Sequence, residues 1–209
     1  MMKNIKTLLI LGLLASIGLM LPSCTKNDET TIVPIGTEYY IDDILSAVPD
    51  SLQTQFFAAF GNVPTGAIPP KIEGSYVMDP KQRVASNMPG WPVNATEPNV
   101  YLRFAKQHNG IVHMDLNETT ETVTDTVFVC GSGDNFAVYF VEDKNYELGW
   151  MKRGVIMKGK MTDNGLADFR YATIVLETKD YSNGQFGLYP NGTYFIYKDG
   201  NGLAENLDW

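Results

Sequence analysis

Apolar and polar residues alternate with a period of two along most of this chain, from Ile72 onward. In residues 110–117, Val112, Met114 and Leu116 occupy one set of alternate positions, and most of the other set is polar. Successive side chains of a β-strand point to opposite faces, so this pattern predicts a half-buried antiparallel strand. Eight runs of this kind are expected to form strands: 73–78, 99–105, 110–117, 122–130, 135–141, 154–162, 167–178 and 193–198.

Short connectors join most neighbouring runs and favour a mostly up-and-down topology. Asp163-Asn164-Gly165 predicts a hairpin, because Asn-Gly accepts the positive φ angles of a type I′ turn. Eight meandering strands bury every edge if they close into a barrel, and a barrel of that size holds side chains or one small ligand. We therefore expect a mainly β fold, an eight-stranded antiparallel up-and-down barrel over residues 71–209.

A short helical segment is expected at residues 41–70, before the barrel. Ile41, Ile44, Leu45 and Val48 recur at helical spacing. After Pro49 a second helix is indicated, with Asp50 as its cap, apolar residues Leu52, Phe56 and Phe60, and Gly61 as its stop. The segment is expected to pack on the barrel, with a plug or docking element as the alternative.

Residues 80–98 form a long, proline-rich connection between the first two predicted strands. It contains Met88 and Trp91 near its centre. Connections of this length are usually functional or disordered, and the prolines oppose disorder. Trp91 therefore either covers the mouth of the barrel or packs on its outside.

The N-terminus has the layout of a signal peptide over residues 1–23. Lys3 and Lys6 precede an uncharged run, Leu8 to Leu21, that contains seven leucines. A transmembrane helix needs about 20 apolar residues, so this run is too short to be a permanent one.

Leu21-Pro22-Ser23-Cys24 resembles the lipobox of bacterial lipoproteins. The resemblance implies that Cys24 carries a thioether-linked diacylglycerol and that residues 24–40 form a lipid-anchored tether to a membrane. Each buried methylene of an acyl chain contributes about 0.8 kcal/mol to such anchoring. The alternative is a soluble secreted protein cleaved nearby.

The polar residues Thr25 to Glu29 resemble the export signal that carries lipoproteins of the Bacteroidetes to the cell surface. The expected location is the outer membrane, exposed at the cell surface, with its periplasmic face as the alternative. The full chain has a net charge of −8, and loss of residues 1–23 removes two lysines and no acid. We therefore expect no nucleic-acid partner, and the lipid rather than surface charge must hold the protein to the membrane.

Gly74-Ser75-Tyr76 resembles the Gly-x-Trp motif that opens the first strand of the lipocalins. The order of elements over about residues 70–200 is also similar: a helical segment, a first strand, a long connection and then short hairpins. The chain thus resembles the lipocalin-like (calycin-like) outer-membrane lipoproteins of the Bacteroidetes, most of which have no assigned activity.

The sequence contains no motif that indicates an enzyme. His108 and His113 lie in different contexts, and neither HExxH nor GxSxG occurs. Cys130 ends an apolar run and is expected to be a small buried residue rather than a reactive thiol. Asp199-Gly200-Asn201-Gly202 lacks the spacing of a calcium loop and is expected to be a turn. We therefore expect no catalytic residue, metal or cofactor.

Two functions remain as hypotheses. In the first, the barrel is a non-catalytic module that binds a small apolar or amphipathic ligand. In the second, the barrel is filled and its exterior binds a glycan or a protein. Arg103, His113 and Asp115 form either a polar cluster in a cavity or the solvated outer face of a strand. The candidate ligand-binding residues are Tyr76, Met88, Trp91, Tyr101, Arg103, His113, Tyr139 and Tyr171.

The lipobox generates the first testable prediction. Cys24→Ala should abolish acylation and membrane association without unfolding residues 71–209, because the anchor lies outside the predicted barrel. Labelling of cells with a clickable fatty acid measures acylation, and undiminished incorporation into the variant would contradict the prediction.

Overall fold

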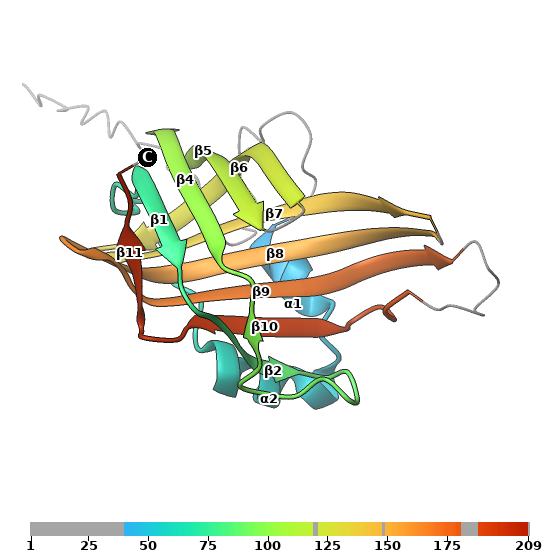
Figure 1. The fold of residues 1–209 in the computed structure, drawn as a ribbon. Coiled ribbons are helices and arrows are strands. Elements are labelled where there is room, and N and C mark those ends of the chain that lie inside the picture. The colour runs from blue at the N-terminus through green and yellow to red at the C-terminus, as the bar shows by residue number, and fades with distance from the viewer. Residues whose placement is uncertain (1–39, 119–120, 148, 181–187, 209) are drawn as a thin grey trace, which may run out of the picture.

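A computed structural model describes residues 40–118, 121–147, 149–180 and 188–208 of the chain. Its 11 strands form one sheet in which all the strand pairings are antiparallel, and two helices precede them (Figure 1). The predicted signal peptide, Cys24 and nearly all of the tether lie outside the described residues. The strands are β1 (Gly74–Met78), β2 (Lys81–Ser86), β3 (Thr96–Glu97), β4 (Val100–His108), β5 (Ile111–Glu118), β6 (Glu121–Ser132), β7 (Asn135–Tyr146), β8 (Gly149–Thr162), β9 (Gly165–Asp180), β10 (Tyr194–Asp199) and β11 (Leu203–Asn206).

Eight of these strands pair in a closed ring, in the order β11, β1, β4, β5, β6, β7, β8 and β9, with β9 returning to β11. From β4 to β9 each strand pairs with the next in the chain, as the short connectors predict. The expectation of a mainly β, antiparallel fold is confirmed. The eighth strand of the ring, however, differs from the one predicted. It is the C-terminal β11, whereas residues 194–199 form β10, which lies outside the ring.

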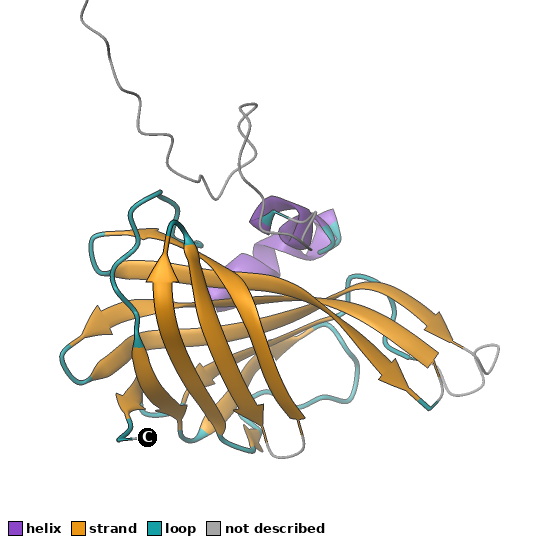
Figure 2. Cartoon of the chain, turned by 90° about the horizontal axis from the view of Figure 1, so that it is seen from above, coloured by secondary structure: helices purple, strands orange, loops and turns teal. Residues whose placement is uncertain are grey.

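Strand β9 pairs with two partners on the same side. Its first residues, Gly165–Ala167, pair with β11, and residues 170–174 pair with β10. Beyond β10 the sheet continues through β2 to β3, so these three strands form a branch beside the ring. Figure 2 shows the long strands extending away from the ring.

The branch corrects the expectation of a long connection at residues 80–98. Lys81–Ser86 pairs with β10, and β3 pairs with β2, so only the tip between them is a loop. The prolines do not prevent this, because they lie at the ends of β2 and β3 and in the tip, where no ladder hydrogen bond from their nitrogen is needed.

A cluster of buried apolar side chains fills the inner face of the ring. Alternate residues of β4 and β5, such as Leu102, Met114 and Leu116, contact those of β7, β8 and β9. Tyr76 is 1% exposed, lies in this cluster and donates its hydroxyl to the carbonyl oxygen of Ile72 at 3.1 Å. Burial raises the pKa of this phenol. The described interior of the ring is therefore a packed core.

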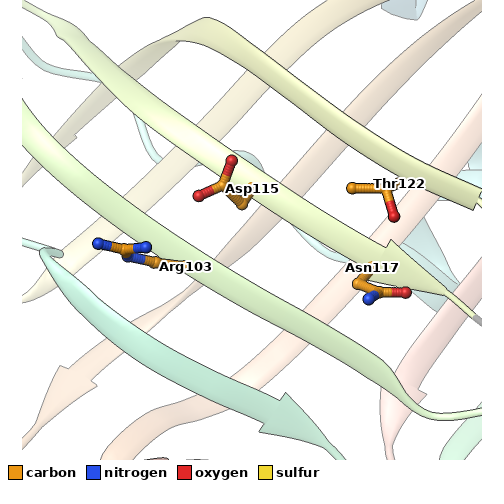
Figure 3. A pocket seen from close by; sticks show the side chains of 4 residues that line it. All are labelled: Arg103, Asp115, Asn117 and Thr122. Atoms are coloured by element: carbon orange, nitrogen blue, oxygen red, sulfur yellow. The ribbon is translucent and has the colours of Figure 1, made fainter. Parts of the chain in front are cut away.

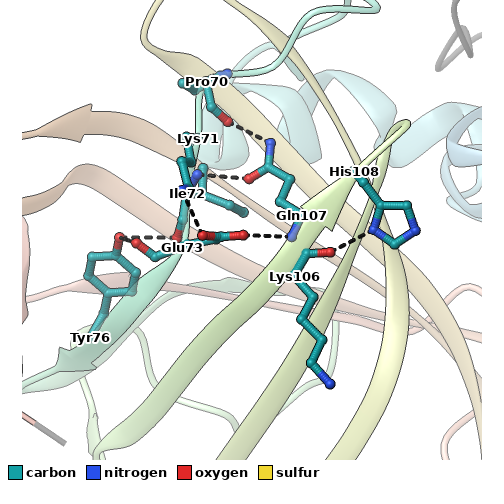
Figure 4. Close-up of polar contacts among 8 residues, drawn as sticks. All are labelled: Pro70, Lys71, Ile72, Glu73, Tyr76, Lys106, Gln107 and His108. Carbon is teal, nitrogen blue, oxygen red and sulfur yellow. Dashed lines mark hydrogen bonds and ion pairs between the residues drawn. The ribbon is translucent and has the colours of Figure 1, made fainter.

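Gln107 ties the residues before β1 to the end of β4 (Figure 4). Its side chain accepts from the Ile72 amide and donates to the Pro70 carbonyl, both at 2.8 Å, while its own amide donates to Glu73 Oε1 at 2.8 Å. Lys71 and the Gln107 amide lower the pKa of Glu73. These contacts fix where β1 begins.

Helices α1 (Ile41–Ser46) and α2 (Asp50–Phe60) cover the opposite face of the sheet. Their apolar faces, including Ile44 and Phe56, pack on β7, β8, β9 and β10. The expected helices and their packing are confirmed, and Gly61 ends α2 with φ of 79°. Asp50 is the first residue of α2 rather than its cap, since Pro49 takes that position.

The predicted hairpin between β8 and β9 is confirmed, with a different turn. Thr162 pairs with Gly165, which leaves Asp163 and Asn164 as the loop. Gly165 adopts a φ of 135°, and neither loop residue has a positive φ, so the turn is not type I′.

The packing of α1 on β8 generates a second prediction. A Cβ atom at Gly154 of β8 would collide with the Ile44 side chain. Gly154→Ala should therefore lower the free energy of unfolding by about 1–3 kcal/mol, measured by chemical denaturation.

The matched experiment is the double variant with Ile44→Ala, which shortens the colliding side chain. Ile44→Ala alone should cost about 2–5 kcal/mol. The double variant should cost less than the sum of the two, and additivity within about 0.5 kcal/mol would contradict this packing.

Candidate functional site

The candidate residues chosen from the sequence do not lie together. Tyr76 and Tyr171 are buried in the core of the ring, whereas Tyr139 is buried on the other face with the helices. Tyr101 is 39% exposed on β4. These residues therefore do not line one common ligand site.

Arg103 and His113 lie on the outer surface of β4 and β5, beside Asp115. A depression of about 410 Å³ lies there, lined by Arg103, Asp115, Asn117 and Thr122 (Figure 3). Asp115 Oδ1 accepts from Thr124 Oγ1 at 2.8 Å and lies 3.7 Å from His113 Nε2. Because Val112 and Met114 are fully buried on the other face, the interpretation as a solvated outer face is correct.

Charged and aromatic side chains instead gather on the inner face of the sheet where the branch leaves the ring. In the pairing of β9, β10 and β2, Tyr171 lies opposite Tyr197, and Tyr197 opposite Arg83, so these three share the face of the ring core. We use the name cation–aromatic cluster for the six side chains from β2, the β2–β3 tip, β10 and the residues before it: Lys81, Arg83, Trp91, Tyr189, Phe195 and Tyr197.

Arg83 lies at the centre of the cluster and is 3% exposed. Its guanidinium forms an ion pair with Glu97 and donates to the Pro92 carbonyl at 3.2 Å. The guanidinium carbon lies 4.4 Å from the centre of the Trp91 ring, which is a cation–π contact. Its Nε atom is buried without an acceptor among the described residues.

Lys81 is the second buried cation of the cluster, at 2% exposure. It forms an ion pair with Glu118 of β5, and its Nζ lies 4.4 Å from the centre of the Tyr197 ring. Burial raises the pKa of Tyr197, and Arg83 opposes that rise.

A further ion pair lies on the same face, where β7 and β8 extend beyond β6. Within the described residues β6 pairs with β7 only as far as Tyr139, while β7 continues beside β8 to Tyr146. Arg153 Nε donates to Glu142 Oε1 at 3.0 Å. Burial lowers the pKa of Arg153, but the Glu142 carboxylate and nearby tyrosines outweigh it and the net shift is upward.

Three aromatic rings form the outer part of the cluster. The Trp91 centroid lies 6.0 Å from that of Tyr189 and 5.0 Å from that of Phe195, and Tyr189 and Phe195 are 5.1 Å apart. All three pairs meet edge to face, which is a favourable geometry for aromatic rings. Trp91 remains 38% exposed, so the trio offers apolar surface to water.

Sequence reasoning found Met88 and Trp91 here, and Tyr171 beside Tyr197, but missed the cations, Tyr189, Phe195 and Tyr197. Met88 lies near the same tip, with its sulfur 3.8 Å from Thr193 Oγ1. Lys81 and Arg83 were not recognised, because the prolines on either side of their strand indicated a loop. The sequence of β2 carries no apolar alternation that would have marked them, although Lys81 and Arg83 are buried in the structure.

The described residues contain no group of three or more His, Cys, Asp or Glu side chains that is suited to hold a metal ion. At Asp199, the carboxylate accepts from the amides of Asp79, Asn201 and Gly202 at 2.9–3.1 Å, so its oxygens organise a turn, as expected. Burial raises the pKa of Asp199, and these amides oppose that rise.

Comparisons with protein-family models, with curated proteins and with solved structures give no match for this chain. Among the described residues, no helix has the length and apolar character needed to span a membrane.

Cys130 is 1% exposed, as expected for a buried residue, and it takes part in a disulfide. The participation in a disulfide corrects the expectation of a simple buried thiol.

The ion pair of Arg83 generates a third prediction. Glu97→Gln removes the carboxylate from a buried guanidinium, which should lower the free energy of unfolding. Because the Glu97 side chain is 23% exposed and water screens part of the interaction, we expect about 1–3 kcal/mol. Lys71→Gln is the control, since its side chain is 76% exposed and its loss should change stability little. Equal denaturation midpoints for the two variants would contradict a structural role for the Arg83–Glu97 pair.

Proposed function

We propose that this chain is a non-catalytic, lipid-anchored binding protein of the outer membrane, with a lipocalin-like barrel, that binds a small amphipathic ligand at the cation–aromatic cluster. The observation that carries the proposal is an aromatic trio whose exposed member, Trp91, stacks on a buried guanidinium. Ligand sites combine apolar and aromatic surface with a few placed polar groups, and this cluster has both.

The ring interior supports the placement of the ligand at the cluster rather than deep in the barrel. Its described side chains already form one packed cluster, including Phe104, Phe136 and Phe169 at 2% exposure or less. A ligand there would have to displace core residues, whereas Trp91 is already partly exposed to water.

A second candidate function is the binding of a glycan or protein through the exterior. The depression lined by Arg103, Asp115, Asn117 and Thr122 favours it, because these polar side chains are open to water on the far side of the sheet from the core. No aromatic ring is among these lining residues, so the depression ranks second as a site for an amphipathic ligand.

The lipid anchor in this proposal is supported by the lipobox-like residues before Cys24. Intact mass of the membrane-extracted protein tests it. An acylated N-terminal cysteine supports the anchor, whereas an unacylated chain refutes it.

The binding proposal generates a fourth prediction. With Trp150 and Trp209 replaced by Phe, emission from Trp91 should shift to the blue when an amphipathic ligand binds, because the ligand removes indole surface from water. Trp91→Ala should weaken binding about thirtyfold, the effect of losing about 2 kcal/mol at an aromatic contact.

Tyr101→Ala is the matched control, since Tyr101 has a similar exposure of 39% but lies on the outer surface. It should leave affinity unchanged. If a panel of fatty acids, sterols, haem and bile acids neither shifts the emission nor raises the melting temperature, the proposal fails and the exterior site becomes the leading candidate.

A further inference from the structure

We infer that the ligand of the cation–aromatic cluster is an amphipathic anion, whose acidic group is recognised by Arg83 while its apolar body lies on the aromatic trio. This inference rests on the proposed function and adds the chemical class of the ligand. It is carried by the cations of this face, the unsatisfied donor of Arg83 and the position of the aromatic rings beside it.

Several cations gather in this region, although the chain as a whole is acidic. The full chain has a net charge of −8. On this face Lys81, Arg83, Lys144 and Arg153 stand against the carboxylates of Glu97, Glu118 and Glu142, with which they form ion pairs. This gathering of cations in an acidic chain favours an anion at this face.

Arg83 also has a hydrogen-bond donor that the protein does not use. Its Nε–H is buried without an acceptor among the described residues, although its other nitrogens contact Glu97 and Pro92. A buried donor without an acceptor is unfavourable, and an oxygen of an incoming acid would remove that penalty. A guanidinium presents its N–H groups in a planar fork that matches a carboxylate or phosphate group.

The rings beside Arg83 indicate where the rest of the ligand lies. Trp91 stacks on the guanidinium and contacts Phe195 and Tyr189, so the apolar surface begins where the charge ends. An acid bound at Arg83 after a shift of Trp91 therefore has its apolar body against these rings. A small polar anion would leave the rings exposed, and a neutral lipid would leave the Nε–H without an acceptor.

A series of ligands with one alkyl chain and different head groups tests the inference on the unmodified protein. Dodecanoate, dodecanol and dodecyltrimethylammonium are titrated below their micelle concentrations, with calorimetry as the readout. Dodecanoate should bind at least about tenfold more tightly than dodecanol, its affinity should fall as salt rises, and the ammonium should not bind.

Arg83→Lys keeps the charge but removes the fork and the Nε–H, so it should reduce dodecanoate affinity about tenfold and leave dodecanol affinity unchanged. Arg103→Gln, on the outer face, is the control and should change neither. The ligand series needs no variant, so a folding defect in Arg83→Lys, detected by circular dichroism, does not prevent the test.

The outcomes separate the inference from the proposed function. Equal binding of acid and alcohol, tightest binding of the ammonium, or unchanged dodecanoate affinity in folded Arg83→Lys would overturn the assignment of an anion to Arg83 and leave an apolar site. Absence of binding by all three amphiphiles would overturn the inference, and failure of the wider panel as well would overturn the proposed function.

Discussion

The architecture depends on the division of one edge of β9 between two partners. The first residues of β9 pair with β11 and close the ring, and the residues that follow pair with β10 and start the branch. Gly165 makes the first of these pairings, and a Cβ atom there would collide with the Ala204 carbonyl of β11. Its φ of 135° is also one that side chains with a Cβ rarely adopt. One glycine thus allows a single sheet to contain both a closed and an open part.

The open part of the sheet contains buried cations, and ion pairs stabilise them there. A cation removed from water needs an acidic partner, and each of the buried cations of β2 has one: Glu118 for Lys81 and Glu97 for Arg83. Lys81 also joins β2 to β5, two strands that are not neighbours in the sheet. The same contacts that stabilise the branch therefore hold the aromatic trio beside a guanidinium, and this juxtaposition distinguishes the face from the apolar ring interior.

The sequence predicted the regular parts of this fold because their signals are local. Alternation in β5 and the spacing of Phe56 and Phe60 in α2 are properties of single elements, and both are confirmed. Ring closure was not predictable in the same way. The short β11 carries little alternation, and its pairing with β9 and β1 depends on residues far away in the chain. The predicted ligand-binding residues do not form one site for a related reason. Tyr76, Tyr139 and Tyr101 have similar sequence contexts but face the core, the helices and the solvent respectively. Of the candidates, Met88, Trp91 and Tyr171 lie in or beside the cluster, whereas Arg83 required knowledge of which strands lie side by side.

Closure by β11 also has a consequence for the dynamics of the ring. This strand has four residues and is held by three pairings to β9 and two to β1, whereas β7 and β8 are joined along twelve. Local opening in proteins begins where few backbone hydrogen bonds and few buried contacts must be broken. The seam beside the C-terminus is therefore the element from which the amide protons should exchange first, while the ladder between β7 and β8 stays protected. The lifetime of the closed ring is therefore set by its shortest strand.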